Sequence, residues 1–100
     1  MIEVKPLSFP EGTALAISVQ LPKTNLLVVT TDKGYIMCGA LDVALLNERL
    51  ADRQILAGRA VGVKTIEELL AAPLESVTTA AQSLGIEVGM SGREAVRKLF

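Results

Sequence analysis

A short apolar segment between two glycines, followed at once by a helical pattern, most strongly limits how this chain can fold. The segment Gly34 to Gly39 holds the single tyrosine and the single cysteine, and its glycines leave room for another backbone or a ligand to come close. Asp42 then stands where a carboxylate can cap a helix, and Val43 to Leu50 spreads its apolar residues over a broad helical arc. Ile55 to Val63 reads as a second, glycine-rich strand. We therefore expect a strand–helix–strand crossover in the middle of the chain.

Strands are also predicted before this unit. Ile2 to Lys5 alternates in polarity until Pro6 interrupts it, which is typical of an edge strand. In Thr13 to Leu21 the large apolar residues recur at every second position, which predicts that their face is buried. These residues are Leu15, Ile17, Val19 and Leu21. Leu26 to Thr30 is a continuous apolar run, which predicts a central strand buried on both faces.

The remaining segments complete an α+β pattern. Asp32 to Gly34 predicts a tight reversal, and Thr65 and Ser91 each begin a capping box. Pro73 suits the first turn of a helix from Leu74 to Leu84, which Gly85 would end. Strands first, then a crossover, then helices predict a two-layer α/β sandwich, with a mixed sheet and helices mainly on one face. One hundred residues suit a single domain spanning residues 1–100.

Composition excludes several classes of function. The chain has no histidine and one cysteine, so an intrachain zinc centre and Ser-His-Asp or Cys-His catalysis lack their residues. We predict no metal site and no cofactor. Ten basic residues, eleven acidic residues and three aromatics offer neither a basic patch nor a stacking platform, so we expect no nucleic-acid partner.

The apolar content is high for so small a chain. Half of the residues are apolar and the mean hydropathy is +0.44. No apolar run approaches the roughly 20 residues that span a bilayer, so we expect no membrane contact. The excess apolar surface instead predicts a homo-oligomer. The first residues lack the pattern of a secretory signal, and a lone cysteine forms no internal disulfide, which favours a cytoplasmic location.

Cys38 is the candidate nucleophile. It precedes a predicted helix N-terminus, where the dipole lowers a thiol pKa, and Asp42 or Lys23 would then transfer protons. The cysteine nevertheless lies in an apolar segment, and the chain has no histidine to act as its base. We therefore predict that Cys38 is buried and structural.

Positive charges give a second set of candidate residues. Arg59 lies in an apolar strand and needs a partner if it is buried, for which we predict Asp42. Lys64 and Arg93 each stand at the start of a capped helix, where an anion can bind. Asn25 lies in a polar loop between two strands.

The segment from Gly58 to Thr65 superficially resembles a phosphate-binding loop, but its glycine spacing is wrong, which rejects nucleoside-triphosphate hydrolysis. The leading hypothesis is a binding module for a small anionic ligand near Arg59, Lys64 or Arg93. An enzyme that uses Cys38 and a structural or interaction subunit without a ligand remain alternatives.

Five segments form a distinctive set: residues 21–25, 34–47, 58–63, 72–78 and 88–95. Together they resemble the YunC-like family, a domain of unknown function found in bacteria and archaea. The resemblance covers essentially the whole chain from Leu21 onward, and the first twenty residues match more loosely. It implies a small two-layer α/β sandwich and implies no biochemical activity.

Overall fold

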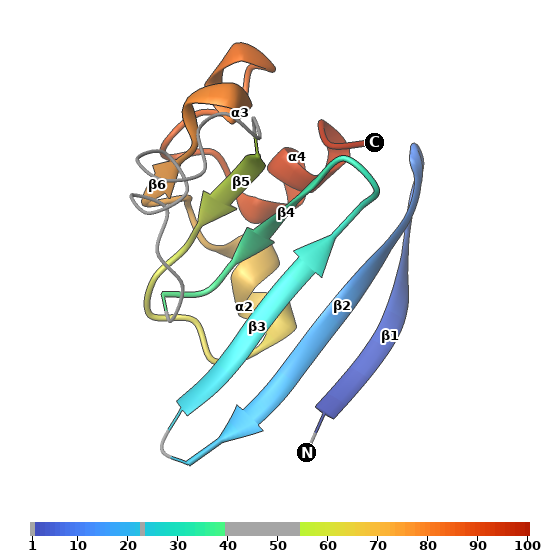
Figure 1. Ribbon diagram of the computed structural model, residues 1–100, viewed down its shortest axis with the longest axis vertical. Coiled ribbons are helices and arrows are strands. Elements are labelled where there is room, and N and C mark those ends of the chain that lie inside the picture. Colours follow the sequence, from blue (N-terminus) through green and yellow to red (C-terminus); the bar gives the residue numbers. More distant parts are fainter. Residues whose placement is uncertain (1, 23, 40–54) are drawn as a thin grey trace.

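The computed structural model describes residues 2–22, 24–39 and 55–100. Within them, six strands form one sheet in the order β1-β2-β3-β4-β5-β6, and short helices pack against it (Figure 1). The strands are β1 (Ile2–Phe9), β2 (Gly12–Leu21), β3 (Thr24–Thr30), β4 (Gly34–Met37), β5 (Leu56–Arg59) and β6 (Ser76–Val77). The helices are α2 (Ile66–Ala71), α3 (Thr79–Ser83) and α4 (Gly92–Arg97). Lys23, Asp42 and the helix predicted from Val43 to Leu50 lie outside the described residues.

The sheet is mixed, as the sequence predicts. Strands β1 to β4 pair antiparallel in chain order, including the predicted hairpin into β4. Strand β5 pairs parallel with β4 and antiparallel with β6. The parallel β4–β5 pair confirms that a crossover connects the two glycine-rich strands.

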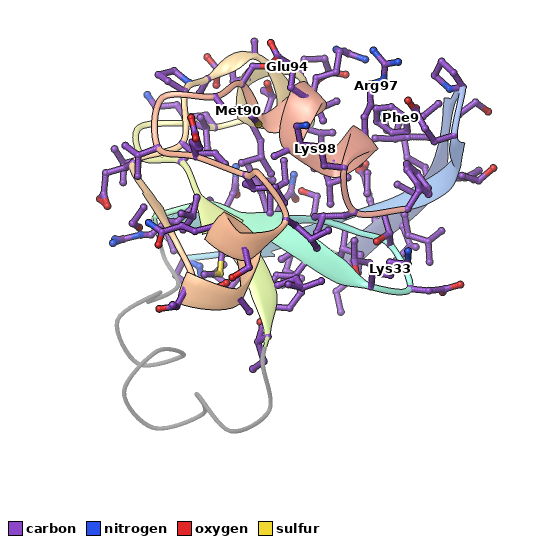
Figure 2. All side chains as sticks on the ribbon, turned by 90° about the horizontal axis from the view of Figure 1, so that it is seen from above. Phe9, Lys33, Met90, Glu94, Arg97 and Lys98 are labelled. Carbon is purple, nitrogen blue, oxygen red and sulfur yellow. The ribbon has the colours of Figure 1, made fainter. Side chains whose placement is uncertain are left out.

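The helices α2 and α4 form a layer on one side of the sheet. They contact each other, and they contact β3 and β4 respectively. Figure 2 shows this layer from its side, with Glu94, Arg97 and Lys98 marking α4 above the strands. Between the layers, Val29, Ile36, Leu69, Val96 and Leu99 are fully buried. The predicted fold class, a two-layer α+β sandwich, is confirmed.

Gly34 allows β5 and the C-terminal segment to come close to the start of β4. A Cβ atom added there would meet the carbonyl oxygen of Leu56 on the parallel strand and come within 2.9 Å of the Leu99 side chain. Any larger residue would therefore push β4 away from β5 or from the end of the chain. Glycine is required here for space and not for backbone conformation, because Gly34 is not one of the glycines with positive φ.

The predicted burial of β2 is wrong. Ala14 and Ala16 face the helices and are buried, whereas Leu15 on the opposite side is 45% exposed. Likewise β3 is buried on one face, since its residues Leu26 and Val28 remain partly exposed. The helix layer covers the side that carries the small residues, so side-chain size was a poor guide to the buried side.

The helix predicted from Leu74 to Leu84 is also wrong in its first half. Residues 76–77 form β6, and the helix begins only after Thr78, whose hydroxyl accepts a hydrogen bond from the Ala81 N–H. The same hydroxyl donates to the Ile55 carbonyl oxygen at 2.6 Å. Pairing with β5 thus holds the segment extended, and tertiary contacts override its helical pattern.

Strand ends differ from prediction as well. Strand β1 continues through Pro6 to Phe9, because it lies at the sheet edge where a missing N–H is tolerated. Strand β5 ends at Arg59 rather than Val63, and a turn follows it.

Candidate functional site

The helix-covered face of the sheet changes from apolar to polar along β2 and β3. On β2 the buried Ala14 and Ala16 are followed on the same face by Ser18 and Gln20. On β3, Asn25 pairs directly with Gln20 and so belongs to the same polar end. In Figure 1 this end of β1, β2 and β3 extends past α2. Polar side chains therefore stay accessible next to the helix layer.

Two adjoining hollows occupy this uncovered end, and Asn25 and Lys64 line both of them. One has a volume of about 520 Å³ and lies between the β2–β3 turn and residues 62–64. The other, of about 310 Å³, lies between the strands and the first turn of α2. We call the two hollows together the Asn25–Lys64 groove. Its further polar residues include Glu3, Lys5, Ser18, Gln20, Thr24 and Glu67.

A turn after β5 brings Lys64 to the groove. Gly62 adopts a φ of +74°, a left-handed conformation that favours glycine, on the way from β5 to α2. The predicted N-cap then follows, since the Glu68 N–H donates to Thr65 Oγ1 at 3.1 Å. The Glu68 side chain reaches one residue further back than in a capping box, and its Oε1 accepts from the Lys64 N–H at 2.7 Å. Two of the backbone donors at the start of α2 are therefore occupied within the chain, as capping by Thr65 and Glu68 predicts, and the side-chain ammonium of Lys64 is its charged donor.

The groove carries charges of both signs. Lys5 Nζ lies 3.9 Å from Glu67 Oε1, and both side chains are more than half exposed. Such an exposed, long ion pair holds its partners weakly. Among the described residues, no carboxylate lies within ion-pair distance of the Lys64 ammonium. Lys64 is thus the groove cation whose charge is not offset by a described neighbour.

Cys38 is buried, as predicted, with 3% of its surface exposed. Its sulfur accepts a hydrogen bond from the Leu27 N–H at 3.3 Å and lies 3.6 Å from the Asn25 carbonyl oxygen, to which the thiol donates. These bonds tie the end of β4 to the start of β3. Cys38 therefore supports the strand that carries Asn25 and is shielded from the groove.

Arg59 lies on the opposite side of the sheet from the helices. One guanidinium nitrogen donates to the Gly39 carbonyl oxygen at 2.8 Å, and another lies 3.6 Å from Glu75 Oε2. Its Nε and the neighbouring Ser76 hydroxyl are buried and have no hydrogen-bond partner among the residues that the structure describes. Among the described residues the acidic partner is thus Glu75, and the predicted pair with Asp42 lies outside them. Glu75 was missed because the sequence placed it inside a helix.

The remaining candidates are separated in the fold. Arg93 is exposed in the first turn of α4, where Ser91 accepts from the Glu94 N–H, and it does not line the groove. Of the four predicted ligand-binding residues, the structure therefore brings together Asn25 and Lys64. Lys5 and Gln20 were missed. The polar–apolar alternation of β1 and β2 could have identified them. It places Lys5 and Gln20 on the helix-facing side of these strands, which is apolar at Ala14 and Ala16.

Comparison with known proteins agrees with this fold. Residues 37–99 match the family model "Domain of unknown function (DUF1805)". The chain is 62% identical over 100 residues to the uncharacterized protein YunC of Bacillus subtilis, and the match covers the whole chain and 99% of that protein. The crystal structure of a protein of unknown function, TA1206 from Thermoplasma acidophilum, superposes with a TM-score of 0.90 at 28% identity. That match covers 100% of this chain and 94% of the other. Within the described residues, no helix has the length and apolar character needed to cross a membrane.

Proposed function

Because this chain belongs to the DUF1805 family, whose function is unknown, we propose a function from its own geometry: a binding module for a small anionic ligand in the Asn25–Lys64 groove. The observation that carries the proposal is the convergence of Asn25 and Lys64 on two adjoining hollows. The residues come from β3 and from the β5–α2 connection, 39 positions apart in the sequence.

The groove has the dimensions of a small-molecule site. Its hollows, of about 520 and about 310 Å³, reach the range of roughly 300 to 1,000 Å³ in which small ligands are usually held. The buried Ala16 and Leu27 form an apolar floor beneath the polar rim. A ligand with a compact apolar part and one anionic group would match this arrangement.

The polar groups favour an anion with additional hydrogen-bond acceptors. The Lys64 ammonium supplies three donors and a charge, and the Asn25 amide supplies two more donors. Lys5 adds a second ammonium, whose pair with Glu67 is weak enough to be exchanged for a ligand. A carboxylate or a phosphate monoester would accept hydrogen bonds from these donors without the help of a metal ion.

No contact of Cys38 favours the enzymatic alternative, since its thiol is buried and hydrogen-bonded to the backbone. Arg59, which the sequence also offered as a ligand-binding residue, is engaged by Glu75 and the Gly39 carbonyl oxygen. The proposal therefore depends on the groove alone.

The test is a thermal-shift screen of the full chain against acetate, inorganic phosphate, a sugar phosphate and a nucleoside monophosphate. A ligand present at 100 times its Kd stabilises the folded state by about 2.7 kcal/mol, which a melting curve resolves easily. Lys64→Gln removes one charge-assisted hydrogen bond and should weaken the binding of the best probe about tenfold or more. Lys33→Gln, an exposed lysine in the β3–β4 turn, is the matched control and should leave binding unchanged.

Two outcomes would contradict the proposal. If none of the four probes shifts the melting temperature, the alternative of a structural subunit without a ligand gains support. If a probe binds equally well to the Lys64→Gln protein, the ligand lies elsewhere and the groove is not its site.

A further inference from the structure

The side of β1, β2 and β3 that faces away from the helices is a continuous apolar surface, which we call the open face. Residues paired directly across antiparallel strands point to the same side, so the register defines its rows. One row contains Ile2, Val19 and Leu26, and the next contains Val4, Ile17 and Val28. Its most exposed large aliphatic residue, Ile2, is 69% exposed, and Leu15 and Leu21 also belong to it. Large aliphatic side chains thus gather where no described helix covers them.

This face carries no charge on the described residues of its three strands. The charged residues of these strands are Glu3 and Lys5, which point to the helix side and line the groove. A membrane-binding surface normally adds lysines or arginines around its apolar residues, and the strands of the open face offer none. An uncharged aliphatic surface is instead complementary to an identical copy of itself.

The free edge of β1 is poorly suited to pairing with another chain. Strand β1 pairs with β2 and ends the sheet on that side, and Pro6 lies in its middle. Proline has no N–H, so it interrupts the row of donors that a further strand would need. A second copy would therefore pack on the face of the sheet and not along its edge.

We propose that two copies of this chain form a dimer by packing their open faces together about a two-fold axis, as the two sheets of a β-sandwich do. Strands of this length and spacing present a surface of roughly 34 by 14 Å. This corresponds to an interface at the small end of the range of specific complexes, below about 1,200 Å² in total. The dimer should therefore dissociate on dilution. Most of the ligand site lies on the other side of the same strands, and the two surfaces share Leu21 and Thr24 at the ends of β2 and β3.

The experiment is sedimentation velocity on the full chain, from low micromolar to several hundred micromolar concentration. The wild-type protein should change from monomer to dimer within this series. Val4→Lys places a charge halfway along the β1 side of the interface and should shift the midpoint at least tenfold towards higher concentration. Val88→Lys is the matched control, since Val88 is also 58% exposed but lies in the loop before α4. It should leave the midpoint unchanged.

Ile2→Lys provides a second variant at the most exposed position, where a lysine cannot disturb the core. Far-ultraviolet circular dichroism of each variant checks that the fold is intact. A wild-type protein that remains monomeric throughout the series would overturn the proposal. So would a dimer whose midpoint is unchanged in both Val4→Lys and Ile2→Lys.

Discussion

The two faces of β2 are built in opposite ways. The face towards the helices carries Ala14 and Ala16, which are buried, and the opposite face carries Leu15 and Ile17, which are larger and remain partly exposed. Both sets alternate along one strand, so local conformation does not distinguish them. What distinguishes them is the position of α2 and α4, which come from residues 66–97, far along the chain.

Burial in this protein is thus decided by topology more than by side-chain size. A helix can approach a sheet closely where the strands carry alanine, and the volume between the layers is then filled by larger residues from neighbouring strands and from the helices. Val29, Ile36 and Leu69 have that role here. No described helix covers the large aliphatic residues on the other face, and the proposed dimer would supply their partner.

The largest expected effect on the free energy of unfolding comes from a comparison of two leucines on adjacent strands. Leu27→Ala removes a side chain that is 1% exposed on the covered face and should lower the free energy of unfolding by about 2–5 kcal/mol. Leu15→Ala, at 45% exposure on the open face, should cost well under half as much. Urea denaturation at low micromolar protein concentration, below the expected midpoint of the proposed dimer, measures both. Equal costs would show that the two faces of the sheet are equally buried in solution.

A second comparison uses the two glycines that frame β4. In Gly34→Ala the new methyl group would meet the Leu56 carbonyl oxygen, so we expect a cost of about 1–3 kcal/mol from overpacking. In Gly39→Ala the nearest atom would be Val61 Cγ1 at 3.3 Å, a side chain that can move slightly, so the cost should be smaller. Thermal melting of both variants tests this order. The reverse order would mean that β4 and β5 pack less closely than the structure shows.

Much of the fold could be predicted from the sequence, because it depends on interactions between residues that are close together in the chain. The alternation of β2, the hairpin at Asp32 to Gly34 and the N-caps Thr65 and Ser91 act over a few residues. The side on which the helices pack is not local information. The prediction for residues 74–84 failed for the same reason, since pairing with β5 and the Thr78 hydrogen bonds come from distant segments.

The candidate site was predicted in part. Asn25 was singled out as part of a polar loop and Lys64 as a cation at the start of a capped helix, but their meeting depends on the path of the β5–α2 connection. Glu75 was not connected with Arg59 because a strand pairing, not a sequence motif, sets them side by side. The sequence could predict which individual side chains are able to bind an anion. Which of them lie close together could be seen only in the structure.

The smallest expected effect concerns the ion pair that ties the β1–β2 hairpin to the covered side. Arg97 Nη2 lies 2.9 Å from Glu11 Oε2, and its hydrogen bond lowers the pKa of Glu11 below the usual 4.5. A lowered folded-state pKa stabilises the protein above pH 4.5, and this contribution disappears as the pH falls through the folded-state pKa. Glu11→Gln should therefore melt slightly below wild type at pH 7, and the difference should vanish in acid, whereas Glu87→Gln, in an exposed loop, should show no such dependence. Because the open face is uncharged, the dimer midpoint of Glu11→Gln should equal that of wild type. A changed midpoint would place the hairpin tip inside the dimer interface and contradict the division between the two faces.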